Sequence, residues 1–304
     1  MRVGTRLLIL KLALAVAVLG GLLVAMHFLL PGLLGRSGAH RPGEDSFFAE
    51  TKAVRVAVPR SGGSLPTGPR LALLLAGQLE AFLQSFCAEF GPALGLQPPG
   101  ERVIVNVFSN HAEAEAFAQE HKLKQDPAHP SAFYGPESWT VAVTLRPYPD
   151  LVGFVFHITT HLLMDRAGGS EAQWSTWLFA GMAVAAEQGG LGQFTRSPGP
   201  VIRRDAAVVL SLASRSAHVP LHMLVRGGQD LFRGPLGSVA YRESGLFVIF
   251  LLRGVASRRE AFLRYLALER QPGPTPPGAL DAALGTDLTQ LEKEWFAFLQ
   301  AIAR

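Results

Sequence analysis

The longest unbroken apolar run of the chain lies near its N-terminus. Residues 12–30 contain one polar side chain, His27, and a helix of this length can cross a hydrocarbon core of ~30 Å. Arg2, Arg6 and Lys11 precede the run, and such basic residues mark the cytoplasmic flank of a membrane helix. The pattern predicts a single-pass anchor in the cell membrane, with the rest of the chain on the extracytoplasmic, periplasmic side.

A cleaved signal peptide is the alternative interpretation of the same run. Ser37 and Ala39 are small residues suited to a cleavage site, although the run is longer than the ~7–15 residues of a typical signal core. Residues 31–49 are rich in Gly, Ser, Arg and His without periodicity, which predicts a flexible tether. The first 30 residues therefore form a cytoplasmic tip and anchor, followed by the tether.

Two periodicities alternate along the next part of the chain. Period-two alternation and runs of β-branched residues predict strands at 52–58, 103–108 and 139–145. Apolar residues at helical spacing predict helices at 71–90, 110–121, 151–166 and 175–187. This mixed order indicates an α+β lobe over residues 50–195.

The remainder of the chain, residues 196–304, has helical spacing throughout. Helices are expected at 204–212, 220–225, 239–252, 258–268 and 287–302. The predicted fold class is therefore α+β. A mixed sheet and a histidine-bearing helix come first, a helical C-terminal lobe follows, and both lie behind one N-terminal transmembrane helix.

Composition narrows the classes of function. The net charge of +4 is modest, and the basic residues form neither a run of five nor a strip interleaved with aromatic residues. We therefore expect no nucleic-acid partner. Cys87 is the only cysteine, which excludes an intramolecular disulfide. It lies beside an apolar stripe of its helix, a position typical of core packing rather than of a reactive thiol.

Two histidines four residues apart are the strongest candidates for chemistry. His157 and His161 leave one face of their predicted helix, as do the zinc ligands of the H-E-x-x-H motif. In that motif the Glu after the first His takes a proton from the metal-bound water. Ile158 stands in its place here and cannot accept a proton. The pattern indicates a metal site without its base, and two histidines packed in a helix core are the alternative.

The sequence around the histidine pair extends this pattern. Residues 174–183, WSTWLFAGMA, are similar to a W-L-x-E-G-L-A segment, and residues 240–244, AYRES, to an A-Y-x-x-S helix. Further similar segments occur, in the same order, at 102–110, 132–135, 139–143 and 280–295. Together they resemble the peptidase-MA-like family, the thermolysin-like gluzincins. The resemblance covers about residues 50–304 and implies a zincin-like fold.

The same resemblance implies that the site is degenerate. The family's third zinc ligand is a Glu at the position of Ala180, which follows His161 by 180 − 161 = 19 residues. An alanine cannot bind a metal, so a firmly bound cofactor is not expected, and zinc is the one candidate. Three carboxylates remain as replacements, Asp165, Glu171 and Glu187. For Asp165 and Glu187 a surface position is the favoured interpretation.

These observations favour a non-catalytic pseudopeptidase that binds peptides or proteins outside the cytoplasm. The resemblance places an edge strand at residues 139–143, where an extended peptide could pair with the backbone. Trp139, Val141 and Val143 are the candidate peptide-binding residues. The alternatives are an active zinc metallopeptidase that uses a non-standard carboxylate, a weak structural metal site, and a purely structural membrane protein.

Overall fold

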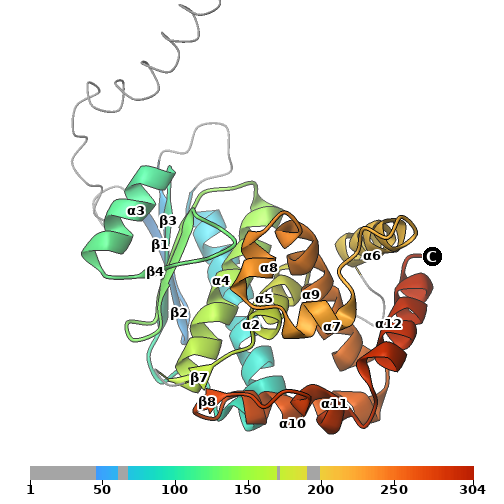
Figure 1. The fold of residues 1–304 in the computed structure, drawn as a ribbon. Helices are drawn as coiled ribbons and strands as arrows, with labels where there is room; N and C mark the ends of the chain where they lie inside the picture. The colour runs from blue at the N-terminus through green and yellow to red at the C-terminus, as the bar shows by residue number, and fades with distance from the viewer. Residues whose placement is uncertain (1–45, 61–67, 170–171, 190–198) are drawn as a thin grey trace, which may run out of the picture. The chain divides into compact units, whose positions relative to one another are not determined.

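A computed structural model describes residues 46–60, 68–169, 172–189 and 199–304 (Figure 1). The chain divides into two compact units, Met1–Arg41 and Pro42–Arg304, and every described element belongs to the second. That unit is a mixed α+β fold, which confirms the predicted class. The membrane-spanning run predicted at 12–30 lies outside the described residues.

A six-stranded mixed sheet forms one side of the unit (Figure 1). Its strands, in spatial order, are β1 (Ser46–Glu50), β2 (Val54–Pro59), β3 (Val103–Phe108), β6 (Thr140–Thr144), β5 (Ala132–Gly135) and β4 (Lys124–Gln125). The β2–β3 and β3–β6 pairs are parallel, and the other pairs are antiparallel. The parallel pairs require long crossovers, and helices supply them.

Helices bury both faces of this sheet. On one face, the valines of β2, β3 and β6 pack against α2 (Pro69–Leu94) and α4 (Tyr148–Gly168). On the other face, α3 (His111–Glu120) packs on a smaller cluster that includes Phe108 and Phe133. This two-sided burial explains why the strands have nearly continuous apolar runs.

The rest of the unit is mainly helical and packs around α5 (Thr176–Glu187) and α9 (Gly237–Arg253). Next to α4 lies α5, which also packs on α9. A Cβ atom at Gly181 would lie 2.7 Å from the Ser244 carbonyl oxygen, so this close crossing requires glycine. The remaining elements are α6 (Pro200–Ala213), α7 (Leu221–Arg226), α8 (Gln229–Arg233), α10 (Ala256–Glu269), α11 (Ala279–Leu284), α12 (Leu288–Ile302) and the short parallel pair β7 (Ala172–Gln173) and β8 (Gly273–Pro274).

One predicted boundary is wrong at the start of the domain. Residues 46–49 were expected in the tether, but they belong to β1, which pairs with β2 from Ser46 opposite Pro59 to Glu50 opposite Arg55. Phe47 and Ala49 are more buried than Phe48 and Glu50, but the residue types do not alternate between apolar and polar along this strand, so the sequence pattern alone does not reveal it.

The predicted edge strand is also wrong. The strand that contains Val141 and Val143 is β6, which is hydrogen-bonded to β3 on one side and to β5 on the other. Both valines are fully buried, and Trp139, just before the strand, is 7% exposed. Because β6 already has two partners, these three residues cannot pair with an added peptide. The strand at that edge of the sheet is the short β4.

One helix in the described part of the chain, α2, is long and apolar enough to cross a membrane. Half of its most apolar window is buried inside the unit, and it packs against β1, β2, α4 and α10. Its buried residues include the phenylalanines Phe82, Phe86 and Phe90. A core helix of a folded domain has these properties, so α2 is here a core element.

Candidate metal centre

The centre is built on α4, which is buried along most of its length. His157 and His161 are 0% and 1% exposed, and their ring centroids are 5.0 Å apart. Ile158 is also 0% exposed and belongs to the main hydrophobic core. The predicted pairing of the two histidines on one helix is therefore present, and the residue at the position of the base is a core residue.

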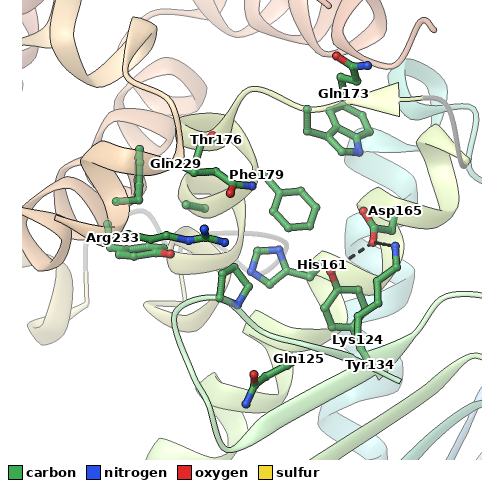
Figure 2. A pocket seen from close by; sticks show the side chains of 15 residues that line it. Lys124, Gln125, Tyr134, His161, Asp165, Gln173, Thr176, Phe179, Gln229 and Arg233 are labelled. Atoms are coloured by element: carbon green, nitrogen blue, oxygen red, sulfur yellow. Dashed lines mark hydrogen bonds and ion pairs between the residues drawn. The ribbon is translucent and has the colours of Figure 1, made fainter. Parts of the chain in front are cut away.

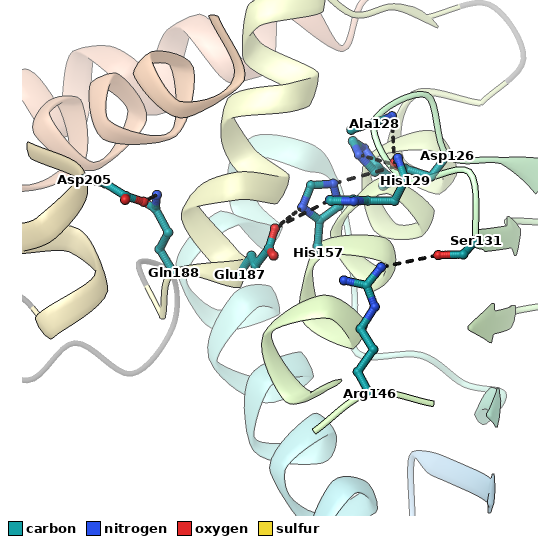
Figure 3. Close-up of polar contacts among 10 residues, drawn as sticks. Asp126, Ala128, His129, Ser131, Arg146, His157, Glu187, Gln188 and Asp205 are labelled. Atoms are coloured by element: carbon teal, nitrogen blue, oxygen red, sulfur yellow. Dashed lines mark hydrogen bonds and ion pairs between the residues drawn. The ribbon is translucent and has the colours of Figure 1, made fainter. Parts of the chain in front are cut away.

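A carboxylate reaches the two histidines from the loop after β4 (Figure 3). Asp126 is 2% exposed, and its Oδ1 accepts hydrogen bonds from the backbone N–H groups of Ala128 (2.9 Å) and His129 (2.7 Å). These bonds fix the turn and leave Oδ2 directed at the imidazoles. Oδ2 lies 3.0 Å from Nε2 of His161 and 3.8 Å from Nε2 of His157.

A second carboxylate orients His157 from the opposite side. Glu187, at the end of α5, lies 2.9 Å from Nδ1 of His157 through its Oε2, and the same oxygen is 3.7 Å from Nε2 of His129 (Figure 3). A Cβ atom at Gly153 would lie 2.7 Å from the Glu187 carbonyl oxygen, so the glycine permits this contact between α4 and α5. A carboxylate bonded to one imidazole nitrogen leaves the other nitrogen free for a metal.

The protonation states suit a metal-binding set. Burial lowers the pKa of His157 despite the hydrogen bond to Glu187, so its imidazole is neutral at pH 7. Burial alone would raise the pKa of Asp126, but His161, His157 and His129 together lower it to about 2. Burial also opposes ionisation of Glu187, yet His129 and His157 hold its pKa well below the usual range. Neutral imidazole and ionised carboxylate are the forms that bind metals.

Several buried atoms of this cluster lack a hydrogen-bond partner within the described part of the chain. They are Oδ2 of Asp126, Nε2 of His157 and both ring nitrogens of His161. The 3.0 Å contact between Asp126 and His161 is an ion-pair distance without the alignment of a hydrogen bond. Unsatisfied buried polar atoms cost about 1–3 kcal/mol each, so a group that binds all of them would stabilise the domain.

A divalent metal ion fits this arrangement. Asp126, His129 and His157 each offer a ligand atom within 4.8 Å of the others, and His161 adds the contact to Asp126 described above. Two imidazoles with one carboxylate is a ligand set used by zinc and by other first-row transition metals. The residues present therefore could hold such an ion, with Glu187 orienting a ligand rather than serving as one.

The other positions predicted from the sequence lie around the centre but outside it. Phe179 of α5 stacks on the His161 ring at 4.2 Å, and Ala180 lines the same pocket as His161. Asp165 binds Lys124 (2.7 Å) and accepts from the Tyr134 hydroxyl (3.2 Å), so it does not join the cluster. Glu171 lies outside the described residues.

Sequence reasoning missed Asp126 and His129, and it missed the contact that Glu187 makes. The Glu187 side chain is 34% exposed, in line with the surface position favoured for it, but its carboxylate also contacts the buried ring of His157. Asp126 and His129 form a D-x-x-H pattern in a polar loop. That pattern was the only sequence signal for them, and it is weak because short loop patterns of this kind are common.

Two cavities flank the centre. The first has a volume of about 490 Å³ and is lined by aromatic side chains next to His161 (Figure 2). The second has a volume of about 900 Å³ and borders His129, His157 and Glu187. Pro127, Phe232, Arg233 and Tyr241 line both, so these four residues separate the two spaces.

Comparisons with protein-family models, with curated proteins and with solved structures find no significant match to this chain. The functional argument therefore depends on the chain's own residues.

Proposed function

We propose that this chain is a membrane-anchored, zincin-like domain that binds one divalent metal ion and does not cleave peptides. The observation that supports metal binding best is the group of ligand atoms from Asp126, His129 and His157, which lie within 4.8 Å of one another. Oδ2 of Asp126 and Nε2 of His157 are buried without a hydrogen-bond partner among the described residues, as is Nε2 of His161, which lies 3.0 Å from that Oδ2. Zn²⁺ is the first candidate, because this ligand set and the predicted extracytoplasmic location suit a redox-inert ion.

Asp126 changes the expectation drawn from the sequence. A site with two histidines and Ala180 would hold zinc weakly, whereas a carboxylate at 3.0 Å from His161 supplies a third protein ligand. We therefore infer stoichiometric zinc rather than traces. A bound ion would act as a Lewis acid in a catalytic site, but here it would serve the structure or the binding properties of the domain.

The absence of catalysis is inferred from the surroundings of the histidines. Ile158 is buried in the core, Glu187 is bonded to His157, and Asp165 is bonded to Lys124 and Tyr134. None of these three is placed as a free base beside the cluster. Oδ2 of Asp126 and the Nε2 atoms of His157 and His161 have almost no exposed surface, whereas a catalytic zinc keeps an open position for water.

The zincin-like identity and the location remain part of the proposal. The order of sheet, histidine helix α4 and small-residue helix α5 supports the first, together with the sequence resemblance to the peptidase-MA-like family. The apolar run at residues 12–30, preceded by basic residues, supports a single-pass anchor with the domain outside the cytoplasm. A peptide or protein ligand is the partner class that such a scaffold suits.

Metal analysis of the purified protein tests the proposal. We expect about one zinc per chain after equilibration with a slight excess of Zn²⁺ and gel filtration. Asp126→Asn keeps the Oδ1 acceptor for the loop and removes the ionised ligand oxygen, so zinc should fall well below half occupancy. His111→Gln is the matched control, because this histidine is exposed and its contacts are with Glu115 and Phe133, outside the metal centre.

The competing outcomes are distinct. Equal zinc in the wild-type protein and in Asp126→Asn would contradict the ligand assignment. Chelator-sensitive cleavage of a peptide library by the wild-type protein would instead contradict the non-catalytic part and leave the metal assignment in place.

A further inference from the structure

The larger of the two cavities has a cationic wall that the metal proposal does not use. Four arginines line its volume of about 900 Å³, and each comes from a different part of the fold. They are Arg146 from the β6–α4 connection, Arg204 from α6, Arg233 from α8 and Arg242 from α9. The volume is in the upper part of the range of small-molecule sites.

Two of the three carboxylates that line the cavity already have partners. Asp205 binds Arg204 at 3.2 Å, lies 3.7 Å from Arg242 and accepts from Gln188 at 2.8 Å. Glu187 is directed at His157. Asp150 is the third acidic residue of the lining, so four guanidinium charges face three carboxylates. Arg146 and Arg233 have no carboxylate within ion-pair distance among the described residues.

Arg146 is held in place with most of its donors unused. Its guanidinium lies 3.6 Å from the centroid of the Phe154 ring, and one nitrogen donates to the Ser131 hydroxyl at 3.3 Å (Figure 3). A stacked guanidinium retains its in-plane N–H donors for an anion. Because the ring already fixes the side chain, little conformational entropy is lost when an anion binds.

Arg233 supplies the second cationic group. It lines both cavities, and Figure 2 shows its guanidinium reaching across the smaller one toward the His161 ring. Tyr241 lines the same two cavities, and Phe232 and Val184 provide apolar wall nearby. A planar guanidinium beside a phenol and apolar side chains suits an oxyanion carried on an apolar body.

We propose that this cavity binds a small organic anion, a carboxylate or phosphate group on an apolar body, through Arg146 and Arg233. The cavity borders His129 and His157 of the metal centre, but the two arginines are not metal ligands, and the proposed site does not require a bound metal. A ligand with a carboxylate would be a peptide with a free C-terminus, and a ligand with a phosphate would be a phosphate ester. Both present at least two anionic oxygens that can accept hydrogen bonds from guanidinium groups.

Ligand titrations of the full-length protein in detergent test the proposal, with binding monitored by saturation-transfer NMR. The probes are N-acetylphenylalanine, its uncharged amide, and phenyl phosphate. We expect at least one acid to bind and the amide to bind at least about tenfold more weakly, because it lacks the charge. Binding should weaken with added salt. Carboxylate-only or phosphate-only binding would identify the source and support the site, and equal binding of acid and amide would contradict it.

Variants then locate the ligand. Because Arg233 is exposed, the Arg233→Gln variant should fold normally. It should weaken anion binding about tenfold or more, which corresponds to ~1.4 kcal/mol. Arg146→Gln should do the same. Arg215→Gln, at the far end of α6 and outside the lining, is the control and should change nothing. Unchanged affinity in both Arg146→Gln and Arg233→Gln would overturn the proposal.

Chelator treatment separates this site from the metal centre. Binding of the acid probe should persist in EDTA, and zinc content should be unaffected in Arg233→Gln. Loss of anion binding in EDTA would show that the anion binds the metal, which would overturn the cavity proposal and leave the metal proposal intact. If the zinc-free protein still binds the acid, the anion binds the cavity itself, which supports the cavity proposal.

Discussion

Two buried carboxylates, Glu269 and Asp126, differ in what surrounds their oxygens. Glu269 of α10 is 0% exposed and fully satisfied. Its oxygens accept from the Ser175 backbone N–H (2.8 Å), from the Ser175 hydroxyl (2.6 Å) and from the Tyr265 hydroxyl. Asp126 is 2% exposed, but only its Oδ1 is satisfied.

The difference separates a structural role from a binding role. Glu269 caps the start of α5 and ties α10 to it, so its bonds already offset the cost of burying a charge. Asp126 directs an unsatisfied, ionised oxygen at two imidazoles whose facing nitrogens are also unsatisfied. A domain tolerates such an arrangement when a bound cation supplies the missing interactions.

Removing the satisfied carboxylate should have the largest effect on stability. Glu269→Ala would leave the Ser175 N–H, the Ser175 hydroxyl and the Tyr265 hydroxyl without their acceptor, and we expect a loss of ~3 kcal/mol or more. Urea unfolding followed by fluorescence measures it. Glu260→Ala, on the exposed face of α10, is the control and should change stability by less than ~0.5 kcal/mol. A small loss in Glu269→Ala would contradict the structural role.

Substituting Asp126, in contrast, should change the free energy of unfolding mainly when metal is bound. With Zn²⁺ at about a hundred times its Kd, the wild-type protein should gain ~2.7 kcal/mol over its EDTA-treated form. Asp126→Asn should lose most of that gain and unfold at nearly the same urea concentration with Zn²⁺ or with EDTA. A metal-dependent gain that survives in Asp126→Asn would show that Asp126 is not a ligand.

Glu187 sharpens the distinction, because its Oε2 contacts two histidines of the centre, Nδ1 of His157 at 2.9 Å and Nε2 of His129 at 3.7 Å, without being a ligand itself. Glu187→Gln can still accept from Nδ1 of His157 but lacks the charge, and we expect zinc affinity to fall about 10-fold. Glu187→Ala removes the acceptor as well and should approach the 100-fold end of the range for such orienting residues. Competition with a zinc-binding dye measures both. Equal affinity in all three proteins would exclude an orienting role.

The sequence predicts much of the fold and half of the centre. Period-two and helical patterns locate most strands and helices, and helical spacing alone places His157 and His161 on one face. Asp126 comes 157 − 126 = 31 residues earlier, in a loop whose conformation depends on its own backbone contacts. No local pattern relates that loop to α4.

The contact between Glu187 and His157 was not predicted for a related reason. Counting along α5 places Glu187 at the helix end, where a glutamate usually faces solvent. Its approach to His157 depends on the crossing of α4 and α5 at Gly153, a packing contact that a single chain's periodicity does not specify. The elements were thus predictable from short-range patterns, whereas the contacts between them required the structure.

A third buried carboxylate, Glu243, provides the smallest and last test of the comparison. It is 0% exposed, accepts from the Val219 N–H at 3.0 Å through Oε2, and has no partner for Oε1 among the described residues. Its Oε2 is bonded to a backbone N–H, whereas Oδ2 of Asp126 faces two imidazoles. Burial, with Glu292 nearby, raises the pKa of Glu243 to about 8 despite the Val219 bond. The carboxyl is therefore mostly protonated at pH 7, and it is not a cation ligand.

The raised pKa of Glu243 predicts that the free energy of unfolding depends on pH. Because the folded-state pKa of Glu243 lies above the unfolded value of ~4.3, the folded state binds more protons between the two values. Its stabilising contribution is complete below the unfolded pKa and is lost as the pH rises through about 8. From pH 6.5 to 7.5 the wild-type protein should lose about 1 kcal/mol more than Glu243→Gln in urea unfolding with EDTA present. Parallel pH profiles in the two proteins would show that Glu243 is ionised when folded. Glu243 would then be, like Asp126, an ionised buried carboxylate with an unsatisfied oxygen, and this feature would no longer mark Asp126 as a metal ligand.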